Sequence, residues 1–192
     1  MTASGRPLSR SSLLGLAAIS ASILCAQIVL SRLFAATLGY YFAFMLISLA
    51  MLGLASGALI VHQKPDALTP ERMSRRASGL AVAAGVAIYA GTLIAIQIYP
   101  YVRTARFLGL SLVFCCFFPF FLFAGMAVTV MLCGAREGFY QAYAVDLIGA
   151  AAGSLLAVLL LGWMSPVAVV FQAVAVLSFL AAISFTIETG DR

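Results

Sequence analysis

The stretch YAVDLIGAAAGSLLAVLLLG, residues 143–162, is an apolar run that contains a single acid, Asp146. A run of about 20 apolar residues is what an α-helix needs to cross a bilayer. Gly149, Gly153 and Ala157 recur every four residues. On a helix they share one face, and small residues on that face let another backbone approach closely. We therefore expect a membrane-spanning helix around which the other spans pack.

Composition supports a membrane protein. The chain has 192 residues, of which 64% are hydrophobic and 9% are charged. A soluble domain carries about 25% charged and 45–50% apolar residues, so this composition excludes an ordinary soluble fold. The net charge of +5 comes from cations dispersed between apolar runs. Because there is no basic stripe, we expect the lipid bilayer, and not a nucleic acid, as the partner of this surface.

Six apolar runs predict an all-α, polytopic transmembrane helix bundle. Residues 1–12 are a polar N-terminal tail, and 188–192 are a short C-terminal tail. The first run exceeds the 7–15 residues of a signal-peptide core, so we interpret it as an uncleaved span. Residues 62–78 are expected to form a polar loop. The expected spans are residues 13–34, 41–61, 79–99, 107–133, 142–163 and 167–187.

Prolines and aromatic residues mark the third and fourth spans. Pro100 is expected to end the third span, and Tyr99 lies where an interfacial aromatic belt would be. Pro119 lies inside the fourth span and is expected to kink it, because proline removes a backbone donor. Six phenylalanines surround Pro119 on all sides, so we expect both packing and lipid contact from them. They are Phe114, Phe117, Phe118, Phe120, Phe121 and Phe123.

The distribution of Lys and Arg predicts the orientation. Cytoplasmic loops carry an excess of these residues. Six spans place both termini on one side, which carries eight of the cations, and the other side carries three. We therefore expect both termini to be cytoplasmic. The eight are Arg6, Arg10, Lys64, Arg72, Arg75, Arg76, Arg136 and Arg192, and the three are Arg32, Arg103 and Arg106.

Motifs for metal binding and catalysis are missing from the sequence. The four cysteines form no CxxC pair, and the single histidine is His62. A structural zinc site needs about four converging Cys or His ligands, so we expect no metal and no cofactor. There is no P-loop, GxSxG or HExxH motif, and no two acids lie within the spans. We therefore expect no catalytic residues in this chain alone.

Ionisable residues near the bilayer are the candidates for a ligand site, because they are expensive to insert. Asp146 has two interpretations. One is a site for a cationic or amine-bearing ligand, and the other is a structural anion stabilised by its helix N-terminus and by Arg136 or the basic loop before the third span. Arg32 either extends to lipid headgroups or takes part in a site. With about 30 Å of hydrocarbon between them, we expect no direct Arg32–Asp146 pair. The candidate ligand-binding residues are Asp146, Tyr143, Arg32 and Gln27.

A second face of small residues lies in the second span. Gly53 and Gly57 are four residues apart, like Gly149 and Gly153 in the fifth span. Such faces are frequent where membrane helices pack closely. We therefore expect the second and fifth spans to be tightly packed, with packing against each other as one arrangement.

Several motifs in order resemble one family. Residues 30–61 contain Arg32 and the run YFAF-x(3)-SLA-x-LGL-x-SG, and residues 118–132 contain PFF-x(3)-G. Residues 139–161 then carry Tyr143, Asp146, Leu147, Gly149 and Gly153. This ordered set, which covers most of the chain, resembles the N-terminal membrane region of bacterial spermidine-synthase-like multi-pass membrane proteins. Gln27 stands where many members of that family carry a glutamate.

The resemblance implies a location and a partner. In that family the membrane region is normally followed by a cytosolic Rossmann-like aminopropyltransferase or methyltransferase-like domain. It implies a bacterial inner-membrane protein with a soluble synthase-like domain or partner at the cytoplasmic face. The catalytic residues of that soluble domain have no counterpart in this sequence.

Three functions remain open from the sequence. The first is a membrane anchor or scaffold for a soluble synthase-like domain or partner. The second is a module that transports an amine or another small metabolite, as a homodimer or other homo-oligomer, with Asp146 as its essential residue. The third is a membrane-embedded enzyme, for which Asp146 and His62 are the few groups suited to acid–base chemistry.

Overall fold

A computed structural model describes residues 9–63, 70–102, 106–135 and 138–190. Within these ranges the chain forms helices and no strand, which confirms the all-α expectation. Six helical segments are long and apolar enough to cross a membrane. They are α1 (Arg10–Thr37), α2 (Tyr41–Gln63), α3 (Pro70–Val102), α4 (Arg106–Gly134), α5 (Phe139–Trp163), and a sixth built from α6 (Pro166–Val169), a π-helical turn η2 (Val170–Val174) and α7 (Ala175–Gly190).

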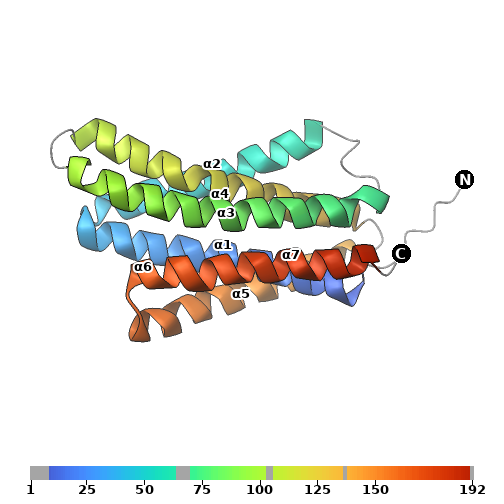
Figure 1. Ribbon diagram of the computed structural model, residues 1–192. Coiled ribbons are helices and arrows are strands. Elements are labelled where there is room, and N and C mark those ends of the chain that lie inside the picture. The colour runs from blue at the N-terminus through green and yellow to red at the C-terminus, as the bar shows by residue number, and fades with distance from the viewer. Residues whose placement is uncertain (1–8, 64–69, 103–105, 136–137, 191–192) are drawn as a thin grey trace, which may run out of the picture.

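The helices lie side by side, and successive spans run in opposite directions (Figure 1). The start of α1 and the end of α7 lie at the same end of the bundle, which we call the proximal end. The end of α1 and the start of α2 lie at the other, distal end, where the chain turns through Gly39. Gly39 has a φ of 113°, a conformation that side chains with a β-carbon rarely adopt, and its N–H donates to the carbonyl of Phe34 at 3.2 Å.

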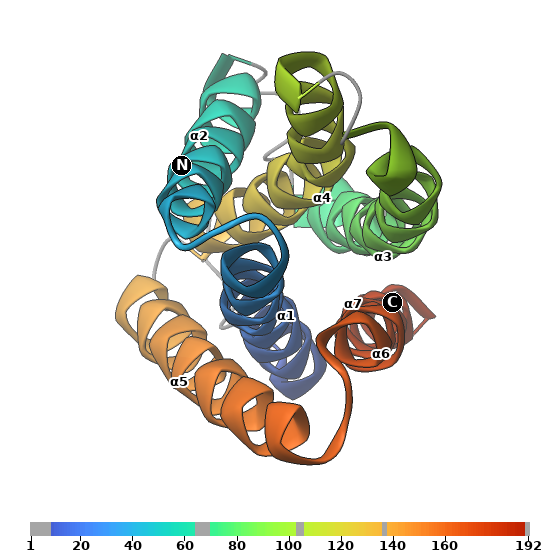
Figure 2. The same cartoon turned by 90° about the vertical axis from the view of Figure 1, so that its left-hand side faces the viewer.

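The centre of the bundle is α1. Figure 2, which looks along the helices, shows α1 between α5 on one side, α7 on another, and α2 with α4 above. In its most apolar stretch 61% of the residues are buried, whereas the corresponding share for α5 is 17%. The expectation that the other spans pack around residues 143–162 is therefore wrong. The helix α5 is peripheral, because it buries one narrow stripe and leaves its other sides exposed.

That narrow stripe packs onto α1. Gly149 and Gly153 face the α1 backbone so closely that an added β-carbon would lie 2.6 Å from Cα of Ala17 and 2.5 Å from Cα of Ala21. Ala157, the third small residue of the stripe, is fully buried. Because membrane helices gain little from removing apolar surface from lipid, contact between backbones is a main source of their association.

The small face of α2, formed by Gly53 and Gly57, packs on α4 and not on α5. A β-carbon at Gly53 would lie 2.6 Å from Cβ of Phe121, and one at Gly57 would lie 2.8 Å from the backbone nitrogen of Met126. Both contacts join α2 to α4, and Gly125 of α4 lies equally close to the α2 backbone. Mutual packing of the second and fifth spans is therefore not the arrangement found, since α2 packs mainly on α4 and α5 mainly on α1.

Helix boundaries differ from the sequence expectation in the third span. Residues 70–78, expected in a polar loop, are the first turns of α3, and α2 extends to Gln63. Pro70 stands at the first helical position, where its missing N–H leaves no hydrogen bond unmade. Pro100 lies inside α3, which ends at Val102, and α4 continues through Pro119 as one helix. Of the six phenylalanines around Pro119, four are buried, so they serve mainly in packing; these are Phe114, Phe117, Phe120 and Phe121.

Aromatic side chains bracket the exposed helix α5. Tyr143 and Trp163 are both exposed, and 20 residues of helix between them span about 30 Å at 1.5 Å per residue. This length equals the thickness of a bilayer's hydrocarbon core, and aromatic residues gather at its two interfaces. At the distal end Tyr40 and Tyr99 are also exposed. These residues indicate a proximal and a distal interface at the two ends of the bundle.

The contact between α5 and α1 predicts opposite effects for two glycines of the same helix. Gly153→Ala should lower the free energy of unfolding by about 1–3 kcal/mol, because the methyl group meets the Ala21 backbone. Gly162→Ala, where a β-carbon meets nothing within 4 Å, should be neutral or stabilise by up to about 1 kcal/mol through helix propensity. Unfolding curves of both variants in one detergent test this, and equal shifts would contradict the packing described.

Candidate functional site

The one acid within the spans lies at the junction of α5 and α1. Asp146 is half-buried, and its Oδ1 accepts a hydrogen bond from the hydroxyl of Ser20 on α1. Ser20 is buried, and its Oγ also lies 2.9 Å from the carbonyl oxygen of Leu16. A hydroxyl carries one proton, so Ser20 divides its donation between the carboxylate and its own helix. Asp146 therefore links α5 to the central helix.

The position of Asp146 along α5 limits the penalty of inserting it. Asp146 is three residues from Tyr143, so it lies about 5 Å inside the proximal aromatic level. A carboxylate near the edge of the hydrocarbon costs far less than one at its centre. The next small residue along the same face is Gly149, which lets the two backbones approach. The site combines a charge-assisted hydrogen bond with close packing, both of which hold two helices together.

Tyr143 lies on the exposed side of α5. Its ring stacks on Phe139, with the ring centroids 6.2 Å apart and the planes at 8°. Its side chain is 48% exposed. This arrangement is that of an interfacial aromatic residue, which presents an apolar ring and a polar tip at the membrane boundary.

Arg32 and Gln27 lie along α1 toward the distal end. Arg32 is exposed and is 12 residues from Ser20, which corresponds to about 18 Å along the helix. Gln27 is half-buried, and its backbone carbonyl accepts a hydrogen bond of 2.6 Å from Ser31. The four candidate residues thus do not converge, and Arg32 is too distant to pair with Asp146. Arg136, another partner considered for Asp146, lies outside the described residues.

The chemistry available at the junction is limited. Ser20 beside a carboxylate superficially resembles an activated nucleophile, but it is 3% exposed and lies between two packed helices. A substrate carbonyl could not reach its oxygen, and nucleophilic catalysis also needs a base that accepts the proton in turn. In the described ranges, no group of three or more His, Cys, Asp or Glu side chains could hold a metal ion.

The interior around α1 is apolar. Its buried side chains are aliphatic and aromatic, with small residues at the closest contacts. The buried hydroxyls of Ser22, Thr92 and Ser178 donate to carbonyls of their own helices, at 2.7, 2.7 and 3.0 Å. Among the described residues, every buried side-chain nitrogen and oxygen has a hydrogen-bond partner. A serine or threonine bonded in this way satisfies itself and offers little to a passing solute.

Sequence reasoning missed the partners of this junction. Ser20, Ala17 and Ala21 lie on α1, and the two alanines repeat at the four-residue spacing of Gly149 and Gly153. That repeat was a visible signal of a complementary small face. Ser20 carries no comparable signal, because serine is common in membrane helices and usually bonds its own backbone.

Comparisons of the chain with protein-family models, with curated proteins and with solved structures find no match.

The Ser20–Asp146 hydrogen bond predicts unequal effects for two serine variants. Ser20→Ala should lower the free energy of unfolding by about 0.6–2 kcal/mol through loss of a bond to a carboxylate. Ser184→Ala is the matched control, because the Ser184 hydroxyl donates to Leu180 of its own helix at 2.9 Å. The measurement is equilibrium unfolding of both variants, of Asp146→Asn and of the Ser20→Ala/Asp146→Asn double variant. Strictly additive effects of the two junction substitutions would show that the residues are not coupled.

Proposed function

We propose that the chain is an integral membrane module that anchors or scaffolds a soluble synthase- or methyltransferase-like domain or partner at the cytoplasmic face of the bacterial inner membrane. The observation that carries this proposal is the interior around α1, which is mainly apolar and in which every buried side-chain nitrogen and oxygen of the described residues already has a hydrogen-bond partner. A bundle with such an interior is suited to hold a fixed shape in the bilayer. The kind of partner proposed rests on the resemblance of the ordered sequence motifs to the spermidine-synthase-like family.

The proximal end is the side where the partner would lie. Arg10 and Arg75 are exposed there, at the start of α1 and near the start of α3. An excess of cations is typical of the cytoplasmic side. The end of α7 lies at this same end (Figure 1), so a soluble domain joined to or bound near α7 would be cytoplasmic. Phe139 and Tyr140 extend exposed rings at this end as well.

Proximity labelling in cells tests the scaffold proposal. A labelling enzyme fused after residue 192 should modify a soluble synthase- or methyltransferase-like protein or domain. The control is the same fusion on a membrane protein of similar size whose C-terminus is cytoplasmic. Deleting this chain should shift the labelled protein from the membrane to the soluble fraction. A labelled set identical to that of the control, with no change in fractionation, would contradict the proposal.

A transport module for an amine is the second candidate, and Asp146 is the observation that favours it. A half-buried carboxylate near the proximal interface could attract a cation. Its hydrogen bond to Ser20 gives the same residue a structural use. The buried residues beyond it along α1 are apolar except for Ser22, whose hydroxyl donates to its own helix. A charged amine would have to leave water there without polar partners, which is unfavourable. The scaffold therefore agrees better with the geometry.

Uptake by the reconstituted chain separates the two candidates. Liposomes containing the purified chain should accumulate radiolabelled spermidine no faster than protein-free liposomes, and Asp146→Asn should leave this background unchanged. Circular dichroism of the variant provides the folding control. Saturable uptake by the wild-type chain that disappears in folded Asp146→Asn would establish transport and refute a purely scaffolding role.

A further inference from the structure

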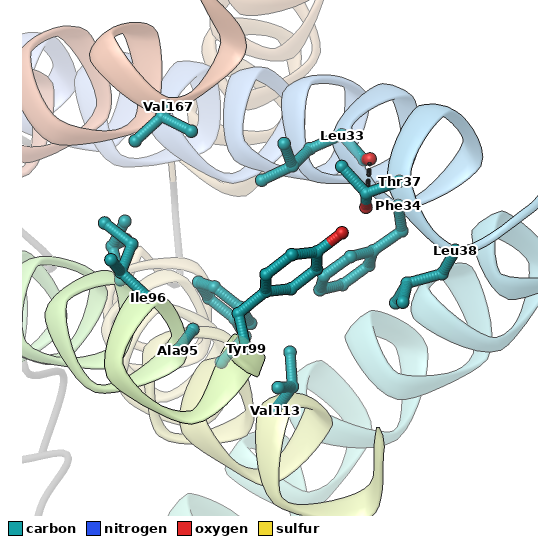
Figure 3. Close-up of a pocket in the computed structure, with 11 residues that line it drawn as sticks. Leu33, Phe34, Thr37, Leu38, Ala95, Ile96, Tyr99, Val113 and Val167 are labelled. Carbon is teal, nitrogen blue, oxygen red and sulfur yellow. Dashed lines mark hydrogen bonds between the residues drawn. The ribbon is translucent and has the colours of Figure 1, made fainter. Parts of the chain in front are cut away.

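A cavity of about 220 Å³ lies near the distal end of the bundle (Figure 3). Its walls come from four helices that are distant in sequence: the last turns of α1, the distal part of α3, the first half of α4 and the start of α6. It is separate from the Asp146 junction, because its α1 residues begin at Leu33, 13 residues beyond Ser20. Residues that define it include Leu33, Phe34, Thr92, Tyr99, Phe117 and Val167.

The floor of the cavity is apolar and buried. The ring of Phe34 lies 5.8 Å from that of Phe117, in an edge-to-face contact, and both side chains are buried. Thr92 is also buried. Its hydroxyl donates to the carbonyl of Ile88 at 2.7 Å, so its hydrogen-bonding proton is used within its own helix. An apolar floor of this kind excludes water, which needs two to four polar partners to enter a cavity.

The mouth of the cavity carries the polar groups. Thr37 is exposed, and its hydroxyl donates to the carbonyl of Leu33 at 2.8 Å, which leaves its oxygen free to accept. Tyr99 is 45% exposed, and Figure 3 shows its hydroxyl directed to the side of the cavity where Thr37 lies. Tyr99 also belongs to the distal aromatic level. The cavity therefore opens at the depth where lipid headgroups meet hydrocarbon.

The surroundings of the protein suggest what fills this space. A cavity of roughly 150 Å³ with an apolar lining admits a benzene molecule, so 220 Å³ accommodates a length of hydrocarbon. An unfilled cavity loses the dispersion contacts of its lining. In the bilayer the molecules present at the mouth are lipids, with a polar head and a long apolar chain. We propose that the cavity binds one hydrocarbon chain of a membrane lipid, whose polar head lies beside Thr37 and Tyr99.

The sixth span is built to complete this site. Val167 lines the cavity, and the chain forms the π-helical turn η2 immediately after the short helix α6. The turn packs against both α1 and α3, the two helices that form opposite sides of the mouth. A π-helical turn inserts an extra residue into a helix and frequently occurs at functional sites. It separates the start of the sixth span, where Val167 lines the cavity, from the regular helix α7.

Photolabelling with a lipid tests the proposal. The full chain is placed in nanodiscs that contain a phospholipid with a diazirine on one acyl chain, irradiated, digested and mapped by mass spectrometry. Adducts should be enriched in residues 33–38 and 95–99 relative to exposed residues of α5 such as Ile148 and Leu155. Ala95→Phe, which fills the cavity from α3, should reduce the enrichment to the α5 level. Ala152→Phe, on the exposed face of α5, is the matched control and should leave it unchanged.

A second filling variant keeps the test decisive. Val167→Phe fills the cavity from the opposite wall, so the result stands if Ala95→Phe fails to fold. Both variants are scored only when their melting temperature equals or exceeds that of the wild type, which is expected when a phenyl ring replaces a void. Cavity labelling no greater than α5 labelling in the wild type, or labelling that persists in both folded variants, would overturn the proposal.

Discussion

Close approach of helix backbones at small residues is the constraint on which this bundle depends, and the contact between α5 and α1 is its clearest case. At Gly149 and Gly153 even a methyl group would overlap the α1 backbone at Ala17 and Ala21. In a bilayer the apolar side chains of a helix gain nothing by leaving lipid for protein, so the gain must come from close packing and from hydrogen bonds. The same physics joins α2 to α4 at Gly53 and Gly57. These small faces thus determine two of the helix pairings, α5 with α1 and α2 with α4.

Asp146 lies at the contact between α5 and α1, and its hydrogen bond depends on the close approach of these two helices. Asp146 stands one helical turn from Gly149, where the two backbones are close enough for the short side chain of Ser20 to reach it. A carboxylate in that position secures the register of α5 on α1, since a slip along the helix would leave it without a donor. This structural use agrees with an apolar interior around α1 and with the scaffold function proposed. The cavity near the distal end shows a different chemistry, apolar at its floor and polar at its mouth.

Much of the fold could be predicted from the sequence, because length and apolarity alone specify six spanning helices. The stripe at Gly149 and Gly153 also stood out. What could not be predicted is which helix is central. In a soluble helix a polar face would reveal the outside, but lipid-facing and buried faces of a membrane helix are equally apolar. Residues 143–162 therefore resembled a core helix, although α5 is the most exposed span and α1 the most buried.

Two features of the structure, the start of α3 and the cavity, left even less trace in the sequence than the choice of the central helix. The start of α3 at Pro70 was hidden by its polar composition, because residues 70–78 extend beyond the most apolar part of the helix. The cavity depends on four helices meeting, and its lining residues have no shared pattern in the sequence. Both arise from tertiary packing. The contact of Ser20 with Asp146 likewise arises from tertiary packing and could not be predicted, since many serines of the chain could have been the partner.

The most direct test of this account is a map of lipid exposure along α1 and α5. A small apolar carbene precursor dissolved in the bilayer labels side chains that face lipid, and mass spectrometry locates the adducts. With α1 at the centre, Ile148, Leu155 and Leu159 of α5 should be labelled strongly, and Ile19 and Leu30 of α1 should remain close to background. Labelling of α1 as strong as that of α5 would contradict the arrangement on which the packing, the Asp146 junction and the scaffold proposal rest.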